Sequence, residues 1–237
     1  TDTSGTWRGC AWLPGDAGIV LPSSEDEGID LTSLALADGR RLHYATPGGG
    51  AAWPSVSARA DVLAFARPTH DTGICLIRTG DRTPEASDLR PVAPSTRPDD
   101  GAVFSPAGDR LAFLSARAGP REVWLCAPDG TGAVPLTSLN GAVVGDLHWR
   151  PDGRHLACTV RQDGSVVVGV LDAATGALTV PERRGRDTDS QDERCEGWTA
   201  DGEQVFYATS RGGAWQLRRR ELDGSEDNQV LPDARHL

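Results

Sequence analysis

The segment Trp149-Arg-Pro-Asp-Gly-Arg-His-Leu156 decides the fold, because its plan recurs along the chain. A large apolar residue, here called the anchor, stands seven positions before a second apolar residue, with a turn between them. The five pairs are Trp12 and Ile19, Val56 and Leu63, Phe104 and Leu111, Trp149 and Leu156, and Trp198 and Val205. Subtracting successive anchor numbers gives intervals of 44, 48, 45 and 49 residues. A period of this size is typical of the blades of a propeller.

Each repeat is predicted to hold four short antiparallel strands. In the third copy the expected strands are 102–105, 110–115, 122–126 and 133–136, each rich in Val, Leu, Phe or Trp and each ending near Gly, Pro or Asp. The turn after the anchor reads Pro151-Asp-Gly153 in the fourth copy. Asp-Gly at Asp38, Asp129 and Asp223 marks the turn from the third strand to the fourth, where Gly supplies the positive φ of a tight hairpin. The pattern therefore predicts hairpin-linked strands.

Stacking of the repeats would give an all-β protein. A four-stranded sheet that is apolar on both faces cannot bury them alone, whereas radial packing of successive sheets buries both. We expect one domain over residues 1–237, a β-propeller of five four-stranded blades. The alternative is that these blades form part of a six-bladed or larger propeller. The expected blades are approximately 7–46, 52–93, 101–137, 143–181 and 194–232.

Composition narrows the classes of partner. The net charge of -10 argues against nucleic-acid binding, which needs a dominant basic surface. The sequence contains no run of about 18 apolar residues, so it predicts no membrane insertion. Because residue 1 is Thr rather than Met, we expect a processed or excised chain. The protein is expected to be a monomer or part of a larger chain.

The five cysteines bear on the compartment. They are odd in number and have no CxxC spacing, which indicates neither a zinc site nor a complete disulfide set. Cys75, Cys126 and Cys158 lie in apolar strand patterns and are expected to be inert. A disulfide between Cys10 and Cys195 is an alternative in an oxidising compartment. The pattern favours the cytoplasm, with the periplasm or secretion as the alternative.

The repeat resembles the WD-like repeat of bacterial TolB-type β-propellers. The matching string is an aromatic anchor, a polar residue, Pro-Asp-Gly-Arg and an apolar strand, and it is clearest at 149–159, 104–119 and 198–213. The first two copies depart from it, with Ala58-Arg59 in place of Pro-Asp and Leu13-Pro-Gly-Asp16 shifted. The resemblance implies the fold but leaves the activity open, because such blades occur in accessory proteins, peptidase gates, sensors and lyases.

Candidate binding residues are those that break the repeat near the expected channel. We expect a non-catalytic scaffold that engages a protein or peptide partner through its loop-rich face or channel, and we assign no catalytic residue. The candidate partner-binding residues are Trp53, Asp99, Asp100, Asp146, His148 and Glu196. The alternative is a carbohydrate-active hydrolase or lyase that uses the channel carboxylates Asp100, Asp146 and Glu196.

Two further sets of charged residues each have a structural and a functional interpretation. An Arg recurs at the end of the second strand of four repeats and is expected to brace the adjacent loop through its planar fork rather than to bind an anion; the four are Arg67, Arg117, Arg161 and Arg211. Asp187, Asp189 and Asp192 lie in a long acidic loop, where alternate carboxylates can hold Ca²⁺. We expect a mobile loop and no cofactor, with Ca²⁺ as the alternative.

Overall fold

The computed structural model describes residues 9–25, 28–44, 51–67, 73–78, 88–139, 141–180, 192–211, 214–222 and 227–230. Nearly all of their regular structure is antiparallel strand. A short 3-10 helix, η1, covers Pro14–Asp16. Among the described residues no helix has the length and apolar character of a membrane span.

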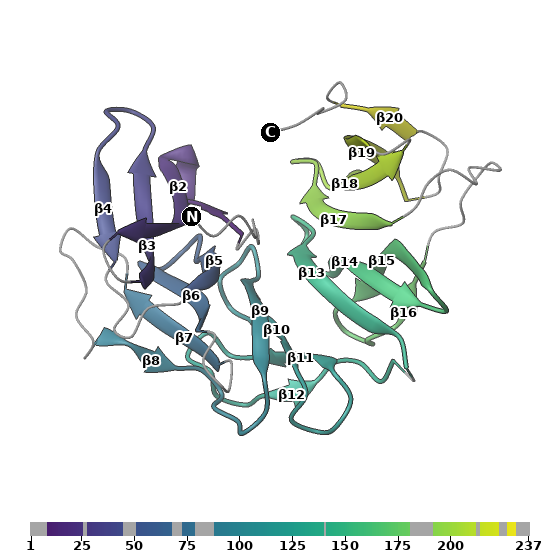
Figure 1. Cartoon of the computed structure of the whole chain (residues 1–237). Coiled ribbons are helices and arrows are strands. Elements are labelled where there is room, and N and C mark those ends of the chain that lie inside the picture. Colours follow the sequence, from purple (N-terminus) through teal and green to yellow (C-terminus); the bar gives the residue numbers. More distant parts are fainter. Residues whose placement is uncertain are drawn as a thin grey trace. The chain divides into compact units, whose positions relative to one another are not determined.

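The strands form five sheets of four, each in chain order (Figure 1). The first sheet contains β1 Ala11–Trp12, β2 Gly18–Glu25, β3 Gly28–Ala35 and β4 Arg41–Tyr44. The second contains β5 Ala52–Val56, β6 Val62–Arg67, β7 Gly73–Arg78 and β8 Arg90–Pro91. The third contains β9 Asp99–Phe104, β10 Leu111–Ser115, β11 Glu122–Cys126 and β12 Val134–Pro135. The fourth contains β13 Val143–Trp149, β14 His155–Gln162, β15 Ser165–Asp172 and β16 Leu178–Thr179. The fifth contains β17 Glu193–Trp198, β18 Gln204–Arg211, β19 Ala214–Glu221 and β20 Asp227–Gln229.

These sheets are the predicted blades, so the expectation of an all-β propeller with five four-stranded blades is confirmed. The spacing of seven also sets the register, because every anchor pairs across the hairpin with its predicted partner. The Cα partners are Trp12 and Ile19, Val56 and Leu63, Phe104 and Leu111, Trp149 and Leu156, and Trp198 and Val205.

The glycine of the turn after the anchor is needed for two reasons. Gly202 has φ +72, and its N–H donates to the Thr199 carbonyl at 2.8 Å. A Cβ on Gly202 would lie 3.1 Å from Arg150 Nε and 3.2 Å from Pro151 Cδ of the preceding blade. Gly108 repeats this arrangement in the third blade, where a Cβ would lie 3.2 Å from Ser57 Oγ. The turn glycine therefore permits both a left-handed backbone and close packing between blades.

The chain divides into two compact units. Unit 1 comprises residues 1–117 and 125–133, and unit 2 comprises residues 118–124 and 134–237. In unit 1 the first and second blades share a core that includes Val20, Leu31, Tyr44, Leu63 and Phe65. In unit 2 the fourth and fifth blades share a smaller core of Ala157, Val168, Cys195, Val205 and Tyr207. The single domain over 1–237 stays a prediction.

All five cysteines are free thiols in the structure. Cys10 belongs to unit 1 and Cys195 to unit 2, so the alternative of a disulfide between them stays a prediction. Cys10 is exposed, whereas Cys126, Cys158 and Cys195 are buried. Burial raises the pKa of Cys126 to about 11 and that of Cys158 to about 12. Because the thiolate is the reactive form, these buried thiols are unreactive at neutral pH, as predicted for the first two.

Candidate functional site

A β-bulge interrupts the first strand of several blades close to the anchor. The pairing register shifts between Ala52 and Ser55 on β5, and between Gly145 and His148 on β13. On β9 the extra residue falls in the interval from Asp100 to Val103. The residue three positions before the anchor has a positive φ in four blades: Gly9 (+75), Trp53 (+49), Gly101 (+61) and Asp146 (+49). In β17 the shift lies between Cys195 and Gly197, and Gly197 has φ +131.

Trp53 and Asp146 are unusual occupants of this bulge position. A left-handed backbone suits Gly, is tolerated by Asp and is strained for a bulky residue such as Trp. Trp53 nevertheless remains 39 % exposed, and Asp146 is also exposed. A conformation that costs free energy and exposes the side chain suggests a role outside the core.

Asp146 is held in place by a hydrogen-bonded link between the fourth and fifth blades. The Thr159 hydroxyl on β14 donates to Asp146 Oδ2 at 2.7 Å. The same hydroxyl oxygen accepts from the Cys195 backbone N–H on β17 at 2.9 Å. Thr159 therefore fixes one carboxylate oxygen of Asp146 beside the strand that carries Glu196.

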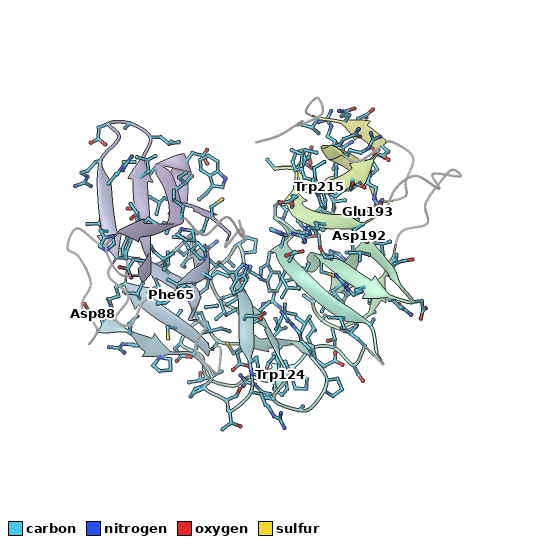
Figure 2. All side chains as sticks on the ribbon, viewed as in Figure 1. Phe65, Asp88, Trp124, Asp192, Glu193 and Trp215 are labelled. Atoms are coloured by element: carbon cyan, nitrogen blue, oxygen red, sulfur yellow. The ribbon has the colours of Figure 1, made fainter. Side chains whose placement is uncertain are left out.

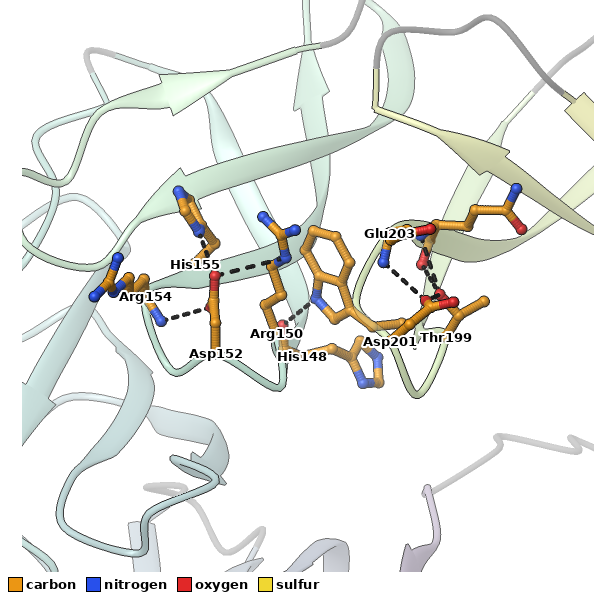
Figure 3. Close-up of polar contacts among 10 residues, drawn as sticks. His148, Arg150, Asp152, Arg154, His155, Thr199, Asp201 and Glu203 are labelled. Carbon is orange, nitrogen blue, oxygen red and sulfur yellow. Dashed lines mark hydrogen bonds and ion pairs between the residues drawn. The ribbon is translucent and has the colours of Figure 1, made fainter.

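His148 lies two residues after Asp146 and is half-buried. Its backbone carbonyl accepts a hydrogen bond from the Trp198 indole at 3.0 Å, which joins β13 to the anchor of the fifth blade (Figure 3). Trp198 also lies against Arg150, whose guanidinium is 5.4 Å from the ring centroid. Burial lowers the pKa of His148, and the nearby charge of Asp146 only partly opposes this. The imidazole is therefore neutral at pH 7.

Glu196 is the second carboxylate that the structure brings to Asp146. Although the residue is exposed, surrounding protein atoms raise the pKa of Glu196, and the negative charge of Asp146 raises it further. Arg194 acts in the opposite direction. The Arg194 guanidinium lies 5.8 Å from the ring centroid of Trp215, which is 46 % exposed. We call Asp146, Arg194, Glu196 and Trp215 the unit 2 site.

Asp99 has a different setting in unit 1. It is 1 % exposed, lies 3.0 Å from the guanidinium of Arg117 and accepts a hydrogen bond from Ser95 Oγ at 2.9 Å. Arg117 also donates to the Ala93 carbonyl at 2.7 Å, which confirms the predicted loop brace in the third blade. Asp100, the next residue along β9, is half-buried opposite Leu114.

The brace is not seen in every blade. Arg161 is exposed at the end of β14, and the side chains of Arg67 and Arg211 lie outside the described residues. The recurrence of Arg at this position of the repeat therefore predicted that Arg117 braces a loop. It did not indicate which of the other repeats have the same hydrogen bond.

Glu193 and Trp215 were not predicted as site residues. Glu193, labelled in Figure 2, is 3 % exposed. It forms two hydrogen bonds of 3.0 Å with Arg220 and accepts from the Val168 N–H at 3.1 Å. Its position five residues before the anchor is the one that Asp99 has in β9, and this shared offset could have revealed it. Trp215 is the second residue of β19, and nothing in its position within the repeat indicates that its side chain is exposed.

The candidate Ca²⁺ residues are only partly described. Asp192 is exposed immediately before β17, whereas Asp187 and Asp189 lie outside the described residues. Within the described part of the chain, no group of three or more His, Cys, Asp or Glu side chains could hold a metal ion. The Ca²⁺ alternative stays a prediction.

The blades and their register define the class of protein, a β-propeller. No protein-family model matches the chain. A TolB homolog from Chlorobium chlorochromatii is 25 % identical over 135 residues, which are 55 % of this chain and 30 % of the relative. The crystal structure of TolB from Acinetobacter baumannii matches with a TM-score of 0.76 and 21 % identity, over 92 % of this chain and 52 % of that one. Sequence and fold together support a TolB-type propeller, as the repeat motif predicted.

The same fold carries other chemistry. An oligogalacturonate lyase, solved in complex with manganese, matches with a TM-score of 0.61 and 16 % identity, over 92 % of this chain and 63 % of that one. This likeness concerns the fold alone. The chain spans about a third of the curated TolB homolog and about half of the Acinetobacter TolB chain.

Proposed function

We propose that this protein is a protein-binding propeller that engages a partner polypeptide through the bulges in the first strands of its blades. The similarity to TolB-type propellers supports protein binding in general. The observation that carries the finer proposal is the placement of Trp53 and Asp146 in left-handed bulges where two other blades have Gly. Both side chains are exposed, and Trp is among the residues that dominate binding energy at protein interfaces.

Photo-crosslinking tests this proposal. A photoreactive phenylalanine analogue at position 53, in unit 1, should capture a polypeptide from the native cell extract. The same analogue at position 196, in unit 2, should also capture a polypeptide. Position 201, an exposed turn residue of the fifth blade, serves as the control and should give no adduct. Equal yields at the three positions, or none at positions 53 and 196, would contradict the proposal.

A carbohydrate-active hydrolase or lyase is the second candidate, and one observation favours it. The surrounding protein atoms and the negative charge of Asp146 raise the pKa of Glu196, and a carboxyl group with a raised pKa is suited to act as a general acid. Incubation with a panel of polysaccharides, including polygalacturonate, should then release products at a rate that Asp146→Asn and Glu196→Gln each abolish. Absence of product formation by the wild-type protein would remove this candidate.

A further inference from the structure

The exposed face of β17 is continuous with an apolar row across the fifth blade. Arg194 pairs with Ala208 on β18, and Ala208 pairs with Leu217 on β19. Trp215 lies two residues before Leu217, so both side chains are on the same face of β19. Ala208 and Leu217 are half-buried and Trp215 is 46 % exposed. The face thus combines an exposed aromatic ring with an apolar floor.

The opposite face of β17 is already occupied. Glu193 and Cys195 alternate with Arg194 and Glu196 along the strand, and they are 3 % and 2 % exposed. Cys195 belongs to the core that the fourth and fifth blades share. The two faces of one strand therefore differ: one is committed to the fold, and the other presents Arg194 and Glu196 to solvent.

Charge indicates what this exposed face would bind. Asp146 and Glu196 repel each other, and the positive charge of Arg194 offsets part of this at Glu196. Arg219, two residues after Leu217, is a further exposed positive charge on the same sheet face. A basic side chain from a partner would reduce that repulsion. The net charge of -10 for the whole chain further disfavours an acidic partner and would attract a basic one over a longer range.

We propose that the unit 2 site docks a polypeptide segment that carries a basic side chain next to an aromatic one. The basic group would lie at Asp146 and Glu196, and the aromatic ring would pack against Trp215. This inference rests on the proposed function, because it names the chemistry of the partner at one of the bulged strands.

Short peptides test this chemistry directly. Fluorescein-labelled hexapeptides with a central Arg-Phe, Glu-Phe or Arg-Gly pair are titrated with the whole chain, and binding is followed by fluorescence anisotropy. The Arg-Phe peptide should bind at least about tenfold more tightly than either of the others, and added salt should weaken it because the contact is electrostatic. Equal affinity for Arg-Phe and Glu-Phe would overturn the proposal.

Variants locate the site. Glu196→Gln and Trp215→Ala should each weaken Arg-Phe binding by about fivefold or more, with thermal unfolding showing that each variant is folded. The matched controls are Glu203→Gln, an exposed acid on the same blade, and Trp12→Ala, an exposed Trp in unit 1, which should both bind like wild type. If Glu196→Gln binds the peptide normally, the site is not the one proposed. If crosslinking at position 53 captures a partner while this peptide preference is absent, the proposed function stands and only the present inference fails.

Discussion

Glu193 and Glu196 lie three residues apart on β17, and their surroundings are opposite. Glu193 is buried and shares two hydrogen bonds with Arg220, whereas Glu196 is exposed and has a raised pKa beside Asp146. The positive charge of Arg220 compensates the charge of Glu193, whereas Glu196 lies near the like charge of Asp146. The difference teaches that the start of the strand serves the fold, while the bulge leaves charge available for another molecule.

Unit 1 contains the same contrast in a weaker form. Asp99 begins β9 with a buried ion pair to Arg117, and Asp100 follows it with a half-buried side chain. The carboxylate that begins a first strand therefore differs in role from the one that follows it, although Asp99 and Asp100 were grouped together as candidate binding residues from the sequence.

The largest expected effect separates Asp99 from Asp100. Asp99→Ala should lower the free energy of unfolding by about 3 kcal/mol, because it leaves the Arg117 charge without its buried partner. Asp100→Ala, the matched neighbour, should lower it by less than about 1 kcal/mol. Chemical denaturation of both variants measures the difference. Equal losses would break the distinction between the two positions.

A smaller effect is expected at the turn glycines. Gly202 and Gly15 both have a positive φ, but a Cβ would meet Arg150 and Pro151 at Gly202 and nothing within 4 Å at Gly15. Gly15→Ala should lower the free energy of unfolding by about 1 kcal/mol through backbone strain alone. Gly202→Ala should lose about 1 kcal/mol more, because the added methyl group also disturbs blade packing. If the two variants match in a denaturation experiment, the close approach between blades contributes nothing.

The smallest effect concerns the coupling of the two exposed carboxylates. Asp146→Asn keeps a hydrogen-bond acceptor for Thr159 and tolerates the left-handed backbone, but it removes the negative charge. The pKa of Glu196 should therefore fall toward its ordinary value, though not fully, since the partial loss of solvation beside surrounding protein atoms contributes more to the shift than Asp146 does. NMR titration of the Glu196 carboxyl carbon measures this. An unchanged pKa would show that the two groups do not interact.

The blades were predictable because their signal is repeated. An anchor and its partner seven residues later specify a hairpin and its register, and five copies specify the architecture. The bulges were not predictable in the same way. An extra residue in β13 leaves the hydrophobic pattern almost intact, so the sequence placed Asp146 near the anchor without indicating its left-handed backbone.

The candidate site was only partly accessible from sequence. Asp146, His148 and Glu196 were selected because they precede anchors, and the structure brings them together in unit 2. The burial of Asp99 was missed, because its partner Arg117 is 18 positions further along the chain and sequence spacing alone does not reveal that pairing. Trp215 was missed because exposure depends on which sheet face a neighbouring blade covers.

The central claim is that the fold depends on Glu193 but not on Glu196, and paired unfolding measurements at pH 7 test it most directly. Glu193→Gln should lower the free energy of unfolding by about 2 to 4 kcal/mol, because it removes the charge that compensates buried Arg220. Glu196→Gln should leave stability unchanged or raise it. A raised carboxyl pKa gives stability that is present below the ordinary pKa and lost as pH rises through the raised one, so any gain should vanish near pH 4. A loss in Glu196→Gln as large as that in Glu193→Gln would contradict the claim.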